Sequence, residues 1–387
     1  MTIRLTLPRA DGSTYAYDVQ GGSSFAPPAA PLTSRVAFAA AHVVADPLAE
    51  QGPAHPPAID WDATLAYRRH LWSYGMAVAE AMDTAQRGMG LEWATARELI
   101  ALSAAEGAAV GGRIASGAGT DQLAPGPGVT VDDVVHAYEE QCAFVEASGS
   151  AVILMASRAL ARCARGPEDY AAVYDRVLAQ VSRPVILHWL GDMFDPALAG
   201  YWGSSDVEEA MDTCLDIMRR HEAKVDGIKI SLLDAEREID MRRRLPASIR
   251  MYTGDDFHYP ELIAGDEHAH SDALLGIFDA IAPAASAAIA RLDAGDAPGF
   301  RAILEPTVAL SRHIFRTPTF HYKTGIVFLA YLTGHQAHFR MLHGQESARS
   351  VVHLAELLVL ADRAGLVSDA ERAASRMRPV LALAGVT

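Results

Sequence analysis

Lysine is nearly absent from this chain of 387 residues, which has Lys224, Lys229 and Lys323 among its 33 basic side chains. Cysteine is also scarce, and the three cysteines are far apart and form no Cys-x-x-Cys pair. This spacing excludes a disulfide framework and favours a reducing compartment. No run of about 18 uninterrupted apolar residues occurs, which argues against a membrane-spanning helix.

The charge balance argues against nucleic acid as a partner. The formal net charge is −15, and no stripe of clustered lysine and arginine is present to neutralise phosphates. We therefore expect a cytoplasmic protein that acts on a small molecule and binds neither nucleic acid nor a membrane.

The pattern of apolar residues divides the chain into three parts. Alternation over residues 2 to 19, interrupted by Asp11-Gly12, predicts a β-hairpin, and a Pro-rich linker follows it to residue 33. Between residues 34 and 283, eight short apolar runs alternate with amphipathic stretches. The runs are residues 35 to 44, 77 to 83, 112 to 117, 151 to 156, 184 to 189, 225 to 231, 248 to 253 and 273 to 278. Residues 284 to 387 are Ala-rich and have helical periodicity.

Eight such units predict an α/β fold, a (β/α)8 TIM barrel with an N-terminal hairpin and a C-terminal helical domain. A doubly wound open sheet is the competing fold. Its dinucleotide fingerprint is incomplete, because Gly117-Ala-Gly119 lacks a third glycine. A phosphate loop of the Gly-Lys-Ser type is excluded because no lysine follows a glycine.

Lys229 is the main candidate for chemistry. It lies in the sixth apolar run, where strand alternation places it on one face with Gly227 and Ser231. An ammonium among apolar neighbours loses hydration, which lowers its pKa and yields an amine that can form a Schiff base. The alternative is a strand-end lysine with a buried stem, whose head reaches water or Asp226.

Three segments in this order resemble the dihydrodipicolinate synthase and N-acetylneuraminate lyase superfamily of class I aldolases, over most of residues 35 to 340. They are Pro184-Val-Ile-Leu-His188, Gly227-Ile-Lys229-Ile-Ser231 and Tyr252-Thr-Gly-Asp-Asp256. The resemblance implies that Lys229 forms a Schiff base with a keto acid or keto sugar, that no cofactor is needed, and that the protein is a homodimer or homotetramer. It implies a lyase, aldolase or dehydratase, with a place in carbohydrate metabolism.

The chain departs from the family pattern at other positions, which indicates a divergent branch. Only Thr84 matches the family's Gly-Thr-Thr-Gly-Glu loop, and Ala159 stands near the position of the family's proton-shuttling tyrosine. His188 could replace that tyrosine, since imidazole titrates near neutral pH; a core or rim histidine is the alternative. Ser157 and Arg158 could line the substrate pocket with Thr84, with Arg158 binding an anion.

The loops after two of the predicted strands supply further candidates for binding substrate. Asp192 and Trp202 could bind and stack a sugar, although packing of this loop on its own barrel is the favoured alternative. Asp255 and His258 follow the seventh strand, where fixing the turn is the favoured role of Asp255.

Two other functions stay open. His188, Asp192, Asp255 and His258 carry the nitrogen and oxygen ligands that a divalent metal prefers, which would suit a metal-dependent sugar isomerase or lyase. A degenerate aldolase that binds a small molecule without turnover is the third hypothesis.

Overall fold

The computed structural model describes residues 3–22, 24–124 and 126–386, and the chain forms two compact units. One unit, which we call the barrel unit, contains residues 35–41 and 77–275. The other, which we call the helical unit, contains residues up to Ser34, then His42–Met76 and the chain from Gly276 onward.

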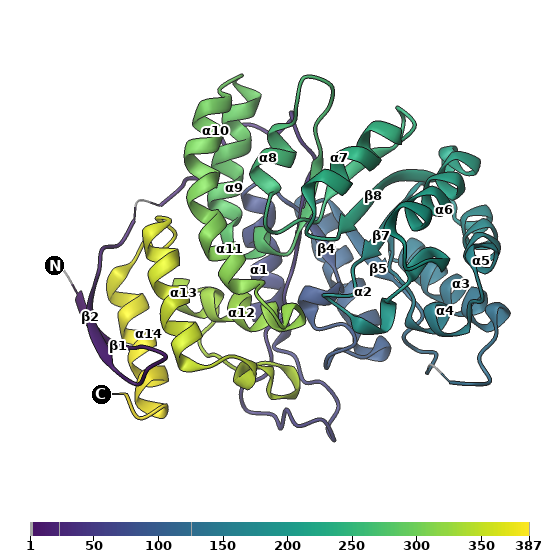
Figure 1. Ribbon diagram of the computed structural model, residues 1–387. Coiled ribbons are helices and arrows are strands. Elements are labelled where there is room, and N and C mark those ends of the chain that lie inside the picture. Colours follow the sequence, from purple (N-terminus) through teal and green to yellow (C-terminus); the bar gives the residue numbers. More distant parts are fainter. Residues whose placement is uncertain (1–2, 23, 125, 387) are drawn as a thin grey trace. The chain divides into compact units, whose positions relative to one another are not determined.

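The barrel unit contains eight parallel strands that close in the order β10-β3-β4-β5-β6-β7-β8-β9 (Figure 1). They are β3 (Ala37–Ala40), β4 (Ala77–Glu80), β5 (Ile114–Ala118), β6 (Ala151–Leu154), β7 (Val185–Leu190), β8 (Val225–Ser231), β9 (Arg250–Thr253) and β10 (Asp272–Leu275). Each strand overlaps one of the eight apolar runs, so the predicted TIM barrel is confirmed.

Helices surround these strands on the outside, and side-chain caps fix where several of them begin. They are α2 (Trp93–Val110), α3 (Val131–Ala147), α4 (Arg158–Cys163), α5 (Pro167–Gln180), α6 (Val207–Arg220), α7 (Ala235–Arg244) and α8 (Tyr259–Ala264). At the start of α3, Thr130 and Asp133 form a reciprocal capping box, which satisfies backbone donors that a helix start leaves free. The carboxylates of Asp206 and Asp234 cap α6 and α7 by accepting hydrogen bonds from backbone amides of the first turn.

Small and apolar side chains fill the interior of the barrel. The cluster contains Phe38, Ala40, Ala77, Ala79, Met82, Ala115, Ile153, Met155, Ile186, Tyr252 and Leu274. Gly227 of β8 makes room for the Tyr252 ring, because a Cβ at this position would lie 2.6 Å from Tyr252 Cε2. The barrel is therefore a packed core, and any chemistry is expected at the carboxyl ends of its strands.

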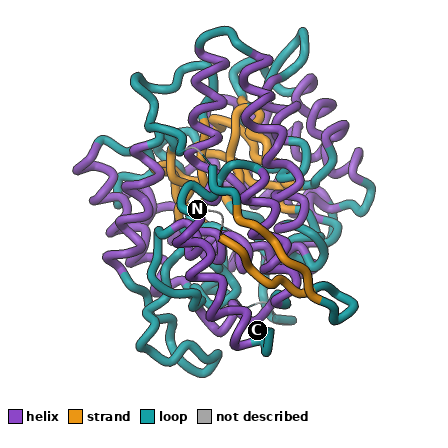
Figure 2. Tube along the Cα trace, turned by 90° about the vertical axis from the view of Figure 1, so that its left-hand side faces the viewer, coloured by secondary structure: helices purple, strands orange, loops and turns teal. Residues whose placement is uncertain are grey.

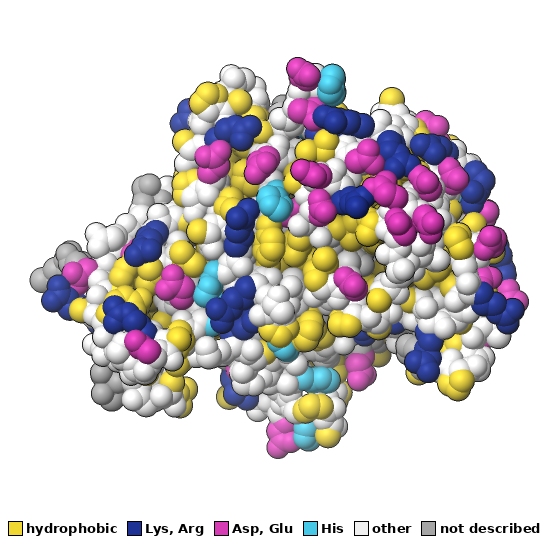
Figure 3. Space-filling model, in the orientation of Figure 1, with side chains coloured by type: hydrophobic (Ala, Val, Ile, Leu, Met, Phe, Trp, Pro, Cys, Tyr) yellow, Lys and Arg dark blue, Asp and Glu magenta, His cyan; other side chains and the backbone are white. Residues whose placement is uncertain are grey.

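Acidic side chains gather over α6 and α7 on the face shown in Figure 3, interleaved with arginines. Arg237 pairs with Glu208, and Arg244 pairs with Asp212 and, at 3.2 Å, with Asp240. The pairs with Glu208 and Asp212 join α7 to α6, whereas the pair with Asp240 lies within α7. Each is expected to contribute little to stability.

The helical unit contains α1 and the C-terminal helices. Their bounds are α1 (Trp61–Ser73), α9 (Ile277–Asp293), α10 (Ala297–Leu304), α11 (Val308–Ile314), α12 (Tyr322–Thr333), α13 (Val351–Arg363) and α14 (Ala370–Leu383). Pro306, which lacks an amide donor, lies between α10 and α11, and α12 ends at Gly334, whose φ is +100°.

The N-terminal hairpin is confirmed as an antiparallel pair, β1 (Ile3–Pro8) with β2 (Thr14–Val19). It lies across the C-terminal helices, and β1 packs against α13 and α14 (Figure 2). The carboxylate of Asp362 in α13 anchors the hairpin, since it accepts hydrogen bonds from the Tyr17 hydroxyl at 2.7 Å and from the amides of Gln20 and Gly21 at 2.9 Å.

The division into residues 1 to 33, 34 to 283 and 284 to 387 remains a proposal. Its second boundary falls inside α9, which continues through Pro283. Within the described parts of the chain, no helix is long and apolar enough to cross a membrane.

Candidate active site

Lys229 lies on the inner wall of the barrel, near the carboxyl end of β8. In the parallel register it is level with His188 on β7 and Tyr252 on β9. The residue is 7% exposed. Among the residues that the structure describes, none forms a hydrogen bond or ion pair with its amine. A buried, unpaired amine is costly for a purely structural residue and is what a nucleophile requires.

Gly254, in the turn after β9, provides the space for this side chain. A Cβ at this position would lie 2.7 Å from Cε of Lys229 and 2.3 Å from Oγ of Ser231. It would also lie 2.5 Å from the backbone oxygen of Ile230. Any larger residue would therefore displace the lysine, which explains a glycine at a position where the structure shows no positive φ.

The charges around Lys229 act in opposite directions on its amine. Burial is the largest effect and lowers the pKa of Lys229, while the carboxylates of Asp256 and Asp83 raise it. The net result is a lowered pKa, so the neutral amine is more populated near neutral pH than for an exposed lysine.

Asp83 was absent from the residues selected by sequence, and Asp256 was named only as part of the Tyr252-Thr-Gly-Asp-Asp256 segment. Asp83 lies in the short 3₁₀ turn η1 (Asp83–Ala85) after β4, directly before Thr84. Asp256 follows Asp255 in the turn after β9. The signal that could have identified both is their position immediately beyond a barrel strand, next to a residue that was selected.

His188 is the ionisable neighbour of Lys229 on the next strand. It is 1% exposed; its Nε2 makes a long contact of 3.5 Å with Oγ of Ser231, and its Nδ1 has no partner among the described residues. Burial lowers the pKa of His188 well below its ordinary value, and the charge of Lys229 lowers it further. A neutral imidazole at this place can accept a proton.

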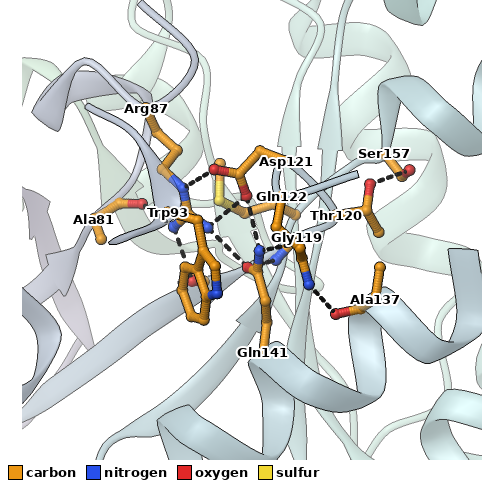
Figure 4. Close-up of polar contacts among 12 residues, drawn as sticks. Ala81, Arg87, Trp93, Gly119, Thr120, Asp121, Gln122, Ala137, Gln141 and Ser157 are labelled. Carbon is orange, nitrogen blue, oxygen red and sulfur yellow. Dashed lines mark hydrogen bonds and ion pairs between the residues drawn. The ribbon is translucent and has the colours of Figure 1, made fainter. Parts of the chain in front are cut away.

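The predicted hydroxyl candidates lie at two other strand ends. Thr84 is buried in η1 after β4. Ser157 caps α4 after β6, and its Oγ lies 2.6 Å from Oγ1 of Thr120, which follows β5 (Figure 4). The Ser157 amide donates to the hydroxyl of Tyr201 at 3.0 Å, so a tyrosine from the loop after β7 does reach the strand end that lacks the family's own tyrosine.

Arg158 is at the rim and already has a carboxylate partner. Its Nε donates to Oδ2 of Asp195 at 2.5 Å, and its side chain is 43% exposed. The guanidinium also lies over Gly88, where a Cβ would approach Nη1 to 2.8 Å. The anion-binding role predicted for Arg158 would therefore compete with an existing ion pair.

A second arginine, Arg87, follows β4 and is the centre of a buried polar network (Figure 4). Its Nε and Nη2 donate to the two carboxylate oxygens of Asp121 at 2.7 and 2.6 Å, and Nη2 also donates to Gln141 Oε1 at 2.7 Å. Its Nη1 donates to the backbone oxygens of Ala81 and Gly117, both at 3.2 Å. All five guanidinium donors are thus in use.

Asp255 and His258 form the turn after β9 rather than converge on the amine. Oδ1 of Asp255 accepts hydrogen bonds from the amides of Phe257 and His258 at 2.8 and 3.0 Å. Its Oδ2 lies 2.9 Å from Nδ1 of His258. The turn-fixing role that the sequence favoured for Asp255 accounts for these contacts.

The loop after β7 places its two candidates in different surroundings. Asp192 is exposed. Trp202, in η3 (Tyr201–Gly203), is 0% exposed and packs against the rings of Tyr170, Tyr174 and Trp189. A fully buried indole has no face available for a sugar, so we drop Trp202 from the proposed site and assign it to loop packing, the alternative favoured by the sequence.

The four residues considered as metal ligands, His188, Asp192, Asp255 and His258, do not form a cluster. Within residues 3–22, 24–124 and 126–386, no three His, Cys, Asp or Glu side chains are arranged to hold a metal ion. The structure therefore provides no observation in favour of this set.

The overall fold is similar to solved dihydrodipicolinate synthases. The enzyme from Aquifex aeolicus is 14% identical with a TM-score of 0.64, and the match covers 86% of this chain and 99% of that one. The enzyme from Bacteroides thetaiotaomicron is 14% identical with a TM-score of 0.64, over 84% and 98% of the two chains. A chloride-inhibited enzyme from Acinetobacter baumannii, solved with pyruvate, is 15% identical with a TM-score of 0.60, over 87% and 100%.

Comparison by sequence leads to a single family. No curated protein matches the chain. A family model described as "Protein of unknown function (DUF993)" matches residues 5–386. The chain therefore belongs to this family, and it has the barrel fold of the dihydrodipicolinate synthases.

Proposed function

We propose that the chain is a Schiff-base-forming lyase or aldolase, or a dehydratase, that acts on a keto acid or keto sugar through Lys229. The observation that carries the proposal is the position of Lys229, 7% exposed near the carboxyl end of β8, level with the buried imidazole of His188, whose Nδ1 has no partner among the described residues. The fold of the dihydrodipicolinate synthases, one of which was solved with pyruvate, supports it.

The first step is condensation. The neutral amine of Lys229 attacks the substrate carbonyl, and loss of one water gives an iminium ion that keeps the positive charge on nitrogen. The lowered pKa of Lys229 favours this attack, because only the unprotonated amine has the required lone pair. The carboxylates of Asp83 and Asp256 then stabilise the iminium charge as they stabilised the ammonium.

The second step needs a base near the bond that breaks. The imidazole of His188 takes the proton from the hydroxyl on the carbon β to the iminium carbon, and that carbon becomes the carbonyl of the first product. The bond between the α- and β-carbons breaks, and its electron pair moves toward the iminium nitrogen to give an enamine. Protonation of the enamine and hydrolysis by water release the second product and restore the lysine. In this scheme His188 transfers the proton, because Ala159, which stands near the position of the resembled superfamily's proton-shuttling tyrosine, has no functional group.

Borohydride trapping tests the Schiff base. The full chain is incubated with a panel of keto acids and keto sugars, reduced, digested and mapped by peptide mass spectrometry. We expect a reduced adduct on Lys229 that disappears in Lys229→Arg and persists in Lys224→Arg. An adduct spread over several lysines, or no adduct with any carbonyl compound, would contradict the proposal.

A second variant separates binding from turnover. His188→Gln should still form the adduct on Lys229 but lose at least about 100-fold in turnover, in line with the contribution of a general base. An adduct without turnover in the unaltered protein would instead favour the third hypothesis, a small-molecule-binding protein with an aldolase fold. The assembly as a homodimer or homotetramer stays a prediction that light scattering would test.

A further inference from the structure

We infer that the Lys229 site takes an uncharged polyhydroxy ketone or aldehyde rather than a keto acid. This inference rests on the proposed Schiff-base function and narrows its substrate class. It follows from how the barrel unit distributes its carboxylates and arginines around the strand ends.

Two carboxylates, those of Asp83 and Asp256, act electrostatically on the amine of Lys229. Asp83 comes from the turn after β4, and Asp256 comes from the turn after β9. The turn after β9 packs on the lysine itself, since a Cβ at Gly254 would lie 2.7 Å from Cε of Lys229. Asp256 is 3% exposed, and charges buried to this extent are poorly screened by solvent. A substrate carboxylate placed beside the iminium would add a further negative charge to this pair.

The first arginine at the strand ends cannot compensate for that charge. All five donors of Arg87 are engaged by Asp121, Gln141 and two backbone oxygens, and the residue is 4% exposed (Figure 4). Binding a substrate carboxylate would require Arg87 to leave a bidentate ion pair. It would also strand the carboxylate of Asp121 in a partly buried position.

The second arginine, Arg158, is also poorly suited to bind a substrate carboxylate. Arg158 pairs with Asp195 through Nε and leaves 43% of its side chain in solvent. An exposed and already neutralised guanidinium gives weak selection for an anion.

Carboxylates suit a polyol in two ways. Each carboxylate oxygen accepts hydrogen bonds from substrate hydroxyls, and such charge-assisted bonds are stronger than neutral ones. The iminium of an uncharged ketone also brings its single positive charge into a site that already stabilises a cation. A keto acid would instead form an iminium beside its own carboxylate and gain less from Asp83 and Asp256.

The test compares two small ketones of similar size, dihydroxyacetone and pyruvate, in reductive trapping with the full chain. Intact mass gives the rate of adduct formation, and peptide mapping assigns the adduct to Lys229. We expect dihydroxyacetone to react at least 10-fold faster than pyruvate. Asp83→Asn and Asp256→Asn should reduce that ratio, whereas Glu267→Gln, whose carboxylate side chain is 84% exposed, should leave it unchanged.

The outcomes separate the two ideas. Faster trapping of pyruvate on Lys229, or a ratio that neither aspartate variant changes, overturns the inference and leaves the Schiff-base proposal standing. Failure of both ketones to label Lys229 in protein whose circular dichroism is native overturns the Schiff-base proposal, and the inference falls with it.

Discussion

Replacing Lys229 with methionine should stabilise the protein while abolishing its chemistry. Methionine keeps most of the length of the lysine side chain and removes the ammonium, which is buried without a hydrogen bond or ion pair to any described residue. A polar group buried without a hydrogen-bond partner costs about 1–3 kcal/mol, and an apolar side chain of similar volume removes this cost. The loss of attraction to Asp83 and Asp256 offsets part of this gain, so we expect about 1–2 kcal/mol.

The gain should depend on pH in a defined direction. Because burial lowers the pKa of Lys229 in the folded state, the unfolded state binds more protons between that lowered value and the ordinary pKa of lysine, about 10.4. Stability of the unaltered protein therefore rises with pH across this window. The advantage of Lys229→Met should be largest at neutral pH and shrink as the pH approaches 10.

Thermal unfolding followed by circular dichroism at pH 7.0 and 9.5 measures both effects. A gain of about 1–2 kcal/mol corresponds to a rise of about 2–8 °C for a unit of roughly 200 residues. Lys224→Met is the matched control, because Nζ of Lys224 donates to the Val181 oxygen at 2.7 Å and its removal should not stabilise. A Lys229→Met protein that melts below the unaltered one at pH 7.0, or a gain that does not shrink at pH 9.5, would refute the reasoning.

Three further substitutions test other parts of the barrel unit. Gly254→Ala should slow adduct formation in the trapping assay at least 10-fold, because the new Cβ would lie 2.7 Å from Cε of Lys229. Gly128→Ala is the control and should leave the rate unchanged, because nothing lies within 4 Å of its new Cβ. Arg87→Lys should lower the free energy of unfolding, measured in urea, by about 2–4 kcal/mol, since an ammonium cannot replace five guanidinium donors. A loss below about 0.5 kcal/mol would show that the hydrogen bonds of Arg87 do not stabilise the barrel unit. Trp202→Ala should cost about 3–5 kcal/mol while the trapping rate per folded molecule stays the same, and a selective loss of trapping would return Trp202 to the site.

The architecture of the barrel could be predicted because each strand carries a local signal. A buried strand between helices is a short apolar run, and all eight runs overlap observed strands. The residues near Lys229 on its own strand followed from the same reasoning, since alternation fixes which side chains share a face. Its closeness to His188 followed from strand order, as neighbouring parallel strands end at the same edge of the barrel.

The surroundings of the loop residues could not be predicted in this way. Whether Trp202 faces a substrate or a core depends on Tyr170 and Tyr174, which come from a different helix. The pairing of Arg158 with Asp195 joins two loops 37 residues apart, and no local pattern encodes it. Asp83 was missed because a lone aspartate after a strand has many structural uses, and the effect of Asp256 on Lys229 depends on how two strands lie side by side.

The sequence also could not predict which segments of the chain form the helical unit. Residues 42–76 lie between two barrel strands and have the same amphipathic pattern as the helices around the barrel. They belong to the same compact unit as the residues up to Ser34 and the chain from Gly276 onward. A sequence pattern reports that a face is buried, but not which distant segment buries it.

The anchoring of the hairpin by Asp362 sets an order for assembly during synthesis. The hydroxyl of Tyr17 cannot form its hydrogen bond until Asp362, 345 residues further along the chain, has been synthesised. At about 5–20 residues per second, the ribosome needs roughly 17–70 s to make this stretch. A two-stranded hairpin alone is marginally stable in water, so this hairpin is expected to become ordered later than the barrel strands that follow it in the chain. The barrel strands can pair meanwhile, because β10 ends more than 80 residues before Asp362 is made.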